Sequence, residues 1–294
     1  MKRSTHFKSL GLAFYILSSL SSGIYMSKGG VPEEIRDEIE EEEMKPRRTK
    51  RSKRERPRLP TGIKKLDEFL QGGIPQGSWL FIAGEPGTGK TVLCLHIAHA
   101  CLKDGMDVIY VTTEQPFRDL LEQARQFSLD LSSFSKDTLH VVDIFNLYEH
   151  AWDARKNGRM KVADPLNPDH LVIYLRELCQ EARLENPLIV IDSLSAFWVD
   201  KPAMARRITY RLKLRLARLR PTVIGTLQYA VTTGSSFGFG AEHIADGIIM
   251  LWIDDVQKTG EIRRHGIIKK MRLTNHYCKV FDYGIVEGKG FVIR

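Results

Sequence analysis

An eight-residue stretch, GEPGTGKT at 84–91, has the residue types and spacing that bind phosphate. It fits the pattern G-x-x-x-x-G-K-[ST], in which glycines let the backbone curl so that successive N–H groups point at an anion. A lysine at this position reaches the β- and γ-phosphates of a nucleotide, and the hydroxyl that follows it can hold Mg²⁺. The predicted nucleotide-binding residues are Gly84, Glu85, Pro86, Gly87, Thr88, Gly89, Lys90 and Thr91, and Thr91 is also a predicted metal ligand.

Three more polar residues follow apolar runs that are typical of buried strands. Asp192 can hold Mg²⁺ through water, or it is only a helix cap, since Ser193 and Leu194 follow it. Glu114 can accept a proton from an attacking water, or it is only an acid in the first turn of a helix. Gln228 can bond a γ-phosphate and shift when that phosphate leaves. Because ligands bind at the carboxyl ends of parallel strands, we expect these side chains to lie near the loop.

Predicted strands and helices alternate along most of the chain. The predicted strands are 79–83, 107–112, 138–143, 188–192, 222–227, 247–253, 262–271, 279–286 and 290–294. The predicted helices are 90–103, 117–127, 169–184 and 202–219, and a short helix ends before Gly72. This order predicts an α/β fold, with a mostly parallel sheet, helices on both of its faces and a β-rich C-terminal end.

Residues 1–58 differ in composition from 59–294, so we predict an N-terminal extension and one nucleotide-binding domain. The extension has an acidic block at 33–43 and a basic block at 45–58, and the basic block holds much of the chain's net charge of +8. Both blocks contain too few apolar residues to order themselves. A solvated linker is the simpler interpretation, and an arm for nucleic acid or anionic lipid is the alternative.

Residues 9–27 form an uncharged stretch with basic residues before it. It is interpreted as a cleaved signal, as a marginal membrane anchor, or as a disordered or untranslated segment before a start at Met26 or Met44. A protein that uses cytosolic ATP is not exported, so we expect a cytoplasmic location and do not favour membrane contact. The four cysteines have no CxxC spacing, which favours buried reduced thiols over a zinc site.

Several segments within residues 59–294 match a known pattern, namely TGIKKLDEFLQGGIPQGS, GEPGTGKT, VIYVTTEQP, LIVIDSLSAF, HIADGIIML and EIRRHGIIKKMRLTNH. Together they resemble the KaiC-like branch of the RecA superfamily, and KPAMARR at 201–207 resembles its single-domain members of unknown role. The resemblance implies a RecA-type core and a ring of subunits, for example a hexamer, with ATP between neighbours.

In that family, a lysine and an arginine of the KMRG segment reach the γ-phosphate held by the adjacent subunit. The matching residues here are Lys270 and Arg272, and His276 stands at the family's histidine position. Cations delivered in this way neutralise charge that develops during phosphoryl transfer. The alternative is an exposed basic strand edge, which discourages aggregation. No Asn-Lys-x-Asp segment for guanine is present in the sequence, so ATP is the expected nucleotide.

The sequence departs from the family pattern at three places. Gln115 stands where the family often has a second acid, which leaves Glu114 as one general base and predicts slow turnover. Leu273 replaces the glycine of KMRG. Glu242 and His243 occupy the place of the Ser-Thr pair that clock proteins phosphorylate, so autokinase activity is not expected. We therefore expect a slow Mg²⁺-dependent ATPase that acts as a nucleotide-gated oligomeric switch on a regulatory protein partner.

The alternative is a single-stranded-DNA-binding ATPase of recombination or repair, like a RecA paralogue. It would use the basic block, the glycine-containing loop at 232–240 and the arginine-rich helix at 205–220. For that helix, a solvated face whose long side chains cover apolar surface is the simpler interpretation.

Overall fold

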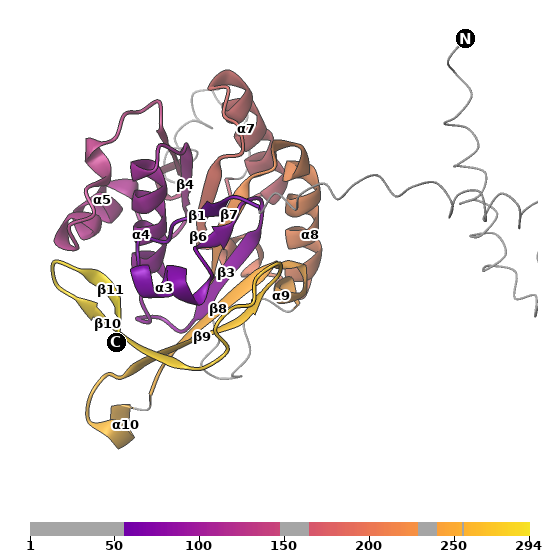
Figure 1. Cartoon of the computed structure of the whole chain (residues 1–294). Coiled ribbons are helices and arrows are strands. Elements are labelled where there is room, and N and C mark those ends of the chain that lie inside the picture. Colours follow the sequence, from indigo (N-terminus) through magenta and orange to yellow (C-terminus); the bar gives the residue numbers. More distant parts are fainter. Residues whose placement is uncertain (1–55, 148–164, 229–239, 255) are drawn as a thin grey trace, which may run out of the picture. The chain divides into compact units, whose positions relative to one another are not determined.

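The computed structural model of the chain describes residues 56–147, 165–228, 240–254 and 256–294 (Figure 1). Most of the predicted N-terminal extension and most of the loop at 232–240 lie outside these ranges. Within them, no helix is both long enough and apolar enough to cross a membrane.

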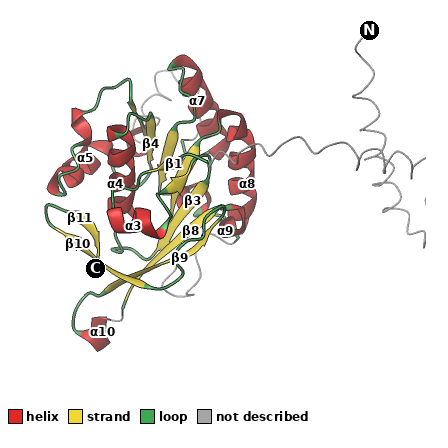
Figure 2. Cartoon of the chain, viewed as in Figure 1, coloured by secondary structure: helices red, strands yellow, loops and turns green. Residues whose placement is uncertain are grey.

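A nine-stranded sheet forms the centre of this region, in the order β11-β10-β9-β8-β3-β7-β6-β4-β5 (Figures 1 and 2). The parallel strands are β3 (Trp79–Gly84), β4 (Val108–Thr112), β5 (Leu139–Asp143), β6 (Leu188–Asp192), β7 (Thr222–Gln228) and β8 (Gly247–Ile253). The antiparallel strands are β9 (Arg264–Met271), β10 (Phe281–Val286) and β11 (Gly290–Ile293). The prediction of a mostly parallel sheet with a β-rich C-terminal end is confirmed.

Helices cover both faces of the sheet (Figure 1). The longer helices are α4 (Lys90–Lys103), α5 (Phe117–Gln126), α7 (Pro168–Glu181) and α8 (Ala205–Leu216). The shorter ones are α3 (Lys64–Phe69), α9 (Ala241–Ile244) and α10 (Val256–Thr259). The apolar side chains of α3, α4 and α5 pack into one hydrophobic core, and those of α7 and α8 pack into a second core. This arrangement confirms the prediction that helices lie on both faces.

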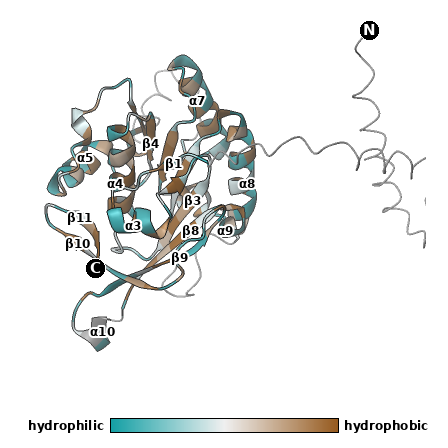
Figure 3. Cartoon of the chain, viewed as in Figure 1, coloured by the Kyte–Doolittle hydropathy of each residue, from teal (hydrophilic) through white to brown (hydrophobic). Residues whose placement is uncertain are grey.

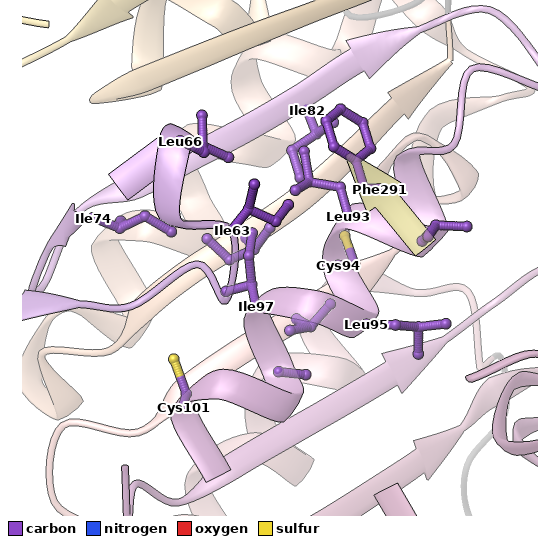
Figure 4. Packing of buried hydrophobic residues seen from close by; sticks show 14 of the residues in the cluster. Ile63, Leu66, Ile74, Ile82, Leu93, Cys94, Leu95, Ile97, Cys101 and Phe291 are labelled. Carbon is purple, nitrogen blue, oxygen red and sulfur yellow. The ribbon is translucent and has the colours of Figure 1, made fainter. Parts of the chain in front are cut away.

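The side chains of β3 point alternately to the two faces of the sheet, so this strand contributes to both cores. Leu80 and Ile82 belong to the core beneath α4, whereas Phe81 and Ala83 belong to the core beneath α7 and α8. Successive side chains of a strand point to opposite faces, so a strand between two helical layers must be apolar throughout. Figure 3 shows the resulting apolar strands, and Figure 4 shows Ile82 close to Leu93 of α4.

The structure differs from the sequence-based prediction in several places, and the short helices α9 and α10 are among the elements that were not predicted. The helix predicted at 202–219 consists of α8 between two short 3₁₀ turns, and it ends where Arg220 takes a left-handed conformation (φ 48°) before Pro221. In addition, β1 (Arg58–Leu59) and β2 (Ile74–Pro75) form a two-stranded sheet that was not predicted. Its strands are too short to show an alternating pattern.

Arg58, which the sequence analysis placed in the extension, fastens this small sheet to the domain. Its guanidinium donates to the carbonyl oxygens of Leu70 and Gly73 at 2.7 and 3.0 Å, and to the hydroxyl of Thr274 at 3.1 Å. The chain therefore contacts the body of the domain from β1 onward.

Candidate functional site

The phosphate-binding loop connects β3 to α4, and its conformation requires glycine. Gly89 has φ 86°, and a Cβ atom there would lie 2.7 Å from the Ile285 side chain. A Cβ atom on Gly84 would lie 2.5 Å from the carbonyl oxygen of Leu251. The loop is also fixed from the C-terminal strands, because the Tyr283 hydroxyl donates to the carbonyl oxygen of Thr88 at 2.6 Å. The shape of the loop therefore depends on its contacts with both β8 and β10.

A cleft of about 400 Å³ opens at this loop and at the carboxyl ends of the neighbouring strands. Lys90, Glu114, Asp192 and Gln228 all line it, as the sequence analysis expected from their positions after strands. The remaining lining residues are Pro86, Gly87, Gly89, Thr91, Val92, Gln123, Phe127, Thr226, Arg264 and Ile285. The structure thus brings the four predicted polar side chains together, and their individual roles stay predictions.

Lys90 folds back over its own loop. Its ammonium group donates to the carbonyl oxygens of Gly84 and Glu85, at 2.9 Å each. Burial lowers the pKa of Lys90, and the charges of Asp192 and Glu114 oppose that shift. The two carboxylates therefore help to keep a partly buried cation charged at the place where phosphate would bind.

Asp192 is buried and is held by two neighbours that the sequence analysis did not predict. The Thr226 hydroxyl donates to Oδ1 at 2.7 Å, and the Tyr110 hydroxyl donates to Oδ2 at 3.2 Å. Burial raises the pKa of Tyr110 well above its usual value, and the charge of Asp192 adds to the shift, so Tyr110 stays a neutral donor. A carboxylate has about four acceptor positions, so lone pairs of Asp192 remain for a metal-bound water.

Glu114 and Gln228 contact each other directly. The Gln228 side-chain amide donates to Oε1 of Glu114, and its backbone N–H donates to the Ser195 hydroxyl at 3.2 Å. Although Glu114 is exposed at the mouth of the cleft, partial burial of its carboxyl raises its pKa, and the charge of Asp192 adds to this shift. A raised pKa makes this carboxylate a stronger base, which suits proton abstraction from water.

The ends of β4 and β6 are tied together beside these acids. The Thr113 hydroxyl accepts from the Ser193 N–H at 2.8 Å and donates to the Ser193 carbonyl oxygen at 3.1 Å. The Thr113 N–H donates to the Asp192 carbonyl oxygen at 2.9 Å. These bonds fix Glu114 relative to Asp192, because each acid adjoins a residue of the pair.

Arg264 lines the cleft and was missed by the sequence analysis. It begins β9, and its Nε donates to the carbonyl oxygen of Gly87 at 3.3 Å. The adjacent Arg263 instead pairs with Glu261 at 2.7 Å. Nothing in the sequence distinguishes these two arginines, because the pairing of β9 with β8 decides which of them faces the loop.

Lys270 and Arg272 do not reach the chain's own cleft. They lie at the end of β9, which runs antiparallel to β8, and so they stand beside the first residues of β8 rather than its carboxyl end. Lys270 donates to the carbonyl oxygen of Ala245, and Arg272 pairs with Asp246 at 3.0 Å. His276 lies in the turn after them, with Nδ1 at 3.4 Å from the carbonyl oxygen of Thr274.

Three basic side chains of the arginine-rich helix α8 make ion pairs within the domain. Arg211 and Arg215 pair with the two oxygens of Asp169 at 2.6 and 2.7 Å, and Lys213 pairs with Asp246 at 2.6 Å. These three side chains are therefore paired with carboxylates of the domain, and the interpretation of the helix as a solvated face whose long side chains cover apolar surface stays a prediction.

Comparisons with known proteins agree with this architecture. A family model described as "ATPase: KaiC" matches residues 59–294. A UPF0273 protein from Thermotoga maritima is 34% identical over 239 residues, which cover 80% of this chain and 95% of that protein. A UPF0273 protein from Methanopyrus kandleri is 33% identical over 231 residues, covering 78% and 89%. The crystal structure of a KaiC-like protein from Pyrococcus horikoshii is similar with a TM-score of 0.65 and 26% identity, covering 81% of this chain and 99% of that one.

Proposed function

Because the chain belongs to the KaiC family of ATPases, whose fold is a RecA-type core, we propose that it binds ATP with Mg²⁺ and hydrolyses it slowly to ADP and phosphate. The observation that carries the proposal is the meeting of Lys90, Glu114, Asp192 and Gln228 in one cleft. Each comes from a different segment at the carboxyl ends of the central strands, which is where ligands of such sheets bind.

Each polar side chain of the cleft has a separate task in this proposal. Lys90 and the loop N–H groups bind the β- and γ-phosphates, and Arg264 adds positive charge beside Gly87. A water attacks the γ-phosphorus, the bond to the β,γ-bridging oxygen breaks, and the proton of the water passes to Glu114. Gln228 bonds the γ-phosphate and thereby exchanges its contact with Glu114 for one with the nucleotide.

Thr91 and Asp192 would hold Mg²⁺. Their hydroxyl and carboxylate oxygens are ligands that this ion prefers, and both residues line the cleft. When bound, Mg²⁺ neutralises charge on the β- and γ-phosphates. The nucleotide base would lie against Val92, Phe127 and Ile285, which give the cleft an apolar part.

We also propose that the active form is an oligomer, in the form of a ring. Lys270 and Arg272 lie away from their own cleft, so they would act on the γ-phosphate in the cleft of a second copy. With Gln115 beside Glu114, a single acid serves as base, which supports slow turnover and a switching role. The output of such a switch would be a nucleotide-dependent contact with a regulatory protein.

The test is ATP turnover by the full chain, with Lys90→Ala and Glu114→Gln as variants. We expect Lys90→Ala to lose ATP binding, whereas Glu114→Gln should bind ATP and turn over about 100-fold more slowly or worse. Normal hydrolysis by Glu114→Gln would remove Glu114 as the base. Adding single-stranded DNA should leave the rate unchanged, and strong stimulation would favour the recombinase-like alternative instead.

A further inference from the structure

Asp246 lies between α9 and β8 and accepts hydrogen bonds from three different parts of the domain. Its Oδ2 accepts from the Lys213 ammonium at 2.6 Å and from the backbone N–H of Trp79 at 3.0 Å. Its Oδ1 accepts from the Arg272 guanidinium at 3.0 Å. The side chain is 17% exposed, so the carboxylate is largely enclosed by these partners.

The backbone of the same residue repeats two of these connections. The Asp246 N–H donates to the carbonyl oxygen of Trp79 at 2.8 Å, and its carbonyl oxygen accepts from the N–H of Arg272 at 2.8 Å. The preceding residue, Ala245, accepts the bond from Lys270. Both proposed trans-acting cations are therefore attached to the short segment that consists of Ala245 and Asp246.

The backbone of Lys270 and Arg272 is held by packing at the end of β9, so only the charged ends of their side chains need further positioning. Lys270 and Arg272 stand on either side of Met271 in the chain, and the Met271 side chain is buried. Met271 packs over Gly247, where a Cβ atom would lie 2.5 Å from its methyl carbon. The backbone of the cations is thus fixed by packing, and their charged ends are fixed by contacts to Ala245 and Asp246.

The Asp246 carboxylate offsets a cluster of positive charge at this place. Lys213, Lys270 and Arg272 are all cations, and the nearby Arg272 charge is one of the causes that lower the pKa of Lys270, after burial. The charge of Asp246 opposes that shift. The ion pairs of Lys213 and Arg272 within the described residues are both made to Asp246.

We infer that Asp246 is a positioning residue, which holds Arg272 and, through its segment, Lys270 in the geometry that reaches a second copy's nucleotide. The inference rests on the proposed trans role of these two cations. Asp246 also joins them to Trp79, the first residue of β3, and the phosphate-binding loop follows the other end of that strand. One strand therefore links the surface that would give cations to a neighbour with the cleft that would receive them.

The experiment compares ATP turnover by the full-length Asp246→Asn variant with that of Asp169→Asn. Asparagine keeps an acceptor for the Trp79 N–H but removes the charge. Asp169→Asn is the matched control, because Asp169 also holds two cations, Arg211 and Arg215, one of them on each oxygen. We expect turnover by Asp246→Asn to fall about 10- to 100-fold with ATP binding to its own cleft unchanged, and turnover by Asp169→Asn to stay within about twofold of the unmodified protein.

Mixed oligomers of two variants distinguish a loss of cation positioning from a general loss of structure. Asp246→Asn subunits keep an intact cleft, and Lys90→Ala subunits keep intact trans cations. In a random equal mixture, about one quarter of the interfaces pair the two intact halves, so about a quarter of normal turnover should return. A mixture of Asp246→Asn with Arg272→Ala should regain nothing, because both variants are defective on the same surface.

The outcomes distinguish this inference from the proposed function. If Arg272→Ala turns over ATP normally, the proposed trans role is wrong and the inference falls with it. If Arg272→Ala is slow and is restored by Lys90→Ala, but Asp246→Asn is normal or is not restored, only the inference is overturned. If Asp246→Asn fails to fold, the Lys213→Met variant takes its place in the experiment. We then expect a smaller loss of ATP turnover, and mixing with Lys90→Ala subunits must restore part of it.

Discussion

Asp192 depends on the Thr226 hydroxyl, which donates to it from the neighbouring strand β7 at 2.7 Å. Thr226→Val keeps the shape of the side chain but leaves one carboxylate oxygen without its donor. We expect the Mg²⁺ concentration for half-maximal ATP turnover to rise about tenfold, because partners behind a metal-binding carboxylate orient it. A magnesium titration of the full chain measures this change.

Thr209→Val provides a control for the loss of a buried hydroxyl. Thr209 is fully buried on α8, and its Oγ1 has no hydrogen-bond partner among the described residues. Its replacement should leave the magnesium dependence of turnover unchanged. The unfolding temperature should stay the same or rise slightly. Equal magnesium curves for Thr226→Val and Thr209→Val would contradict the role given to Thr226.

Leu273 adopts a backbone conformation that suits glycine, with φ 63° and 69% of its surface exposed. A left-handed conformation costs a leucine roughly 1–2 kcal/mol, and glycine would lose part of that gain through its more flexible unfolded chain. We therefore expect Leu273→Gly to raise the free energy of unfolding by about 0.5–1 kcal/mol. Denaturant unfolding of the full chain measures this value.

Leu273→Ala separates the backbone effect from the loss of an exposed side chain. Alanine keeps a Cβ atom, so the unfavourable conformation remains and no gain is expected. The carbonyl oxygen of Leu273 accepts from Arg58 at 3.3 Å in either variant, so that contact does not distinguish them. A loss of stability in Leu273→Gly would mean that the leucine side chain itself stabilises the turn.

The sequence predicts the positions of the proposed site side chains better than it predicts the residues that hold them in place. Lys90 could be placed by the loop motif, and Glu114, Asp192 and Gln228 because each follows an apolar run and parallel strands end on one side of the sheet. Thr226 escaped prediction because it lies inside a strand, where its alternation with apolar neighbours indicates only a face. Partners of this kind depend on which strands are adjacent, and strand order is not encoded in local spacing.

His96 connects two elements, the helix α4 and the strand β11. Its Nε2 accepts from the N–H of Phe291 at 3.0 Å, and burial together with the nearby His99 lowers its pKa to about 4. The folded state therefore keeps His96 neutral while the unfolded chain binds a proton below pH 6.5. Its stability contribution is complete above pH 6.5 and falls, by about 3 kcal/mol in total, as the pH drops toward 4.

His96→Gln isolates this contribution, because its amide oxygen can accept from Phe291 but does not titrate. The difference in unfolding free energy between the two proteins should shrink or reverse as the pH falls from 6.5 toward 4. His265 does not imitate this behaviour, since its hydrogen bonds to Asp254 and Asp282 outweigh burial and raise its pKa. A pH-independent difference between the two proteins would mean that His96 is not neutral in the fold.

The elements themselves follow closely from apolar periodicity and glycine positions. The predicted helix at 90–103 and the predicted strands at 188–192 and 247–253 have the observed bounds. The pairing of β1 with β2 could not be predicted, because two residues per strand give no period. The same limit applies to the 3₁₀ turns around α8, where local hydrogen bonding rather than burial decides the geometry.

On the scale of the whole domain, the cleft lies at the carboxyl ends of the central strands, and the proposed trans cations lie beside their amino ends. The strand β3 spans six residues, or about 20 Å, between Trp79, which contacts Asp246, and the phosphate-binding loop. The side chains of Lys270 and Arg272, beside the amino end of β3, cannot extend across that distance to the loop at its carboxyl end. A single chain therefore holds both halves of the proposed catalytic site without joining them.

If two copies must meet to complete the site, turnover per subunit depends on protein concentration. It should rise as the protein is concentrated and level off once assembly is complete, because each added interface supplies Lys270 and Arg272 to one cleft. Arg272→Ala should stay slow at every concentration, whereas its binding of ATP should be unchanged. Turnover measured over a dilution series, beside the mass of the particles by light scattering, tests this expectation. Constant turnover per subunit down to the monomer would show that one chain is sufficient, and Arg264 would then be the cation that serves the γ-phosphate.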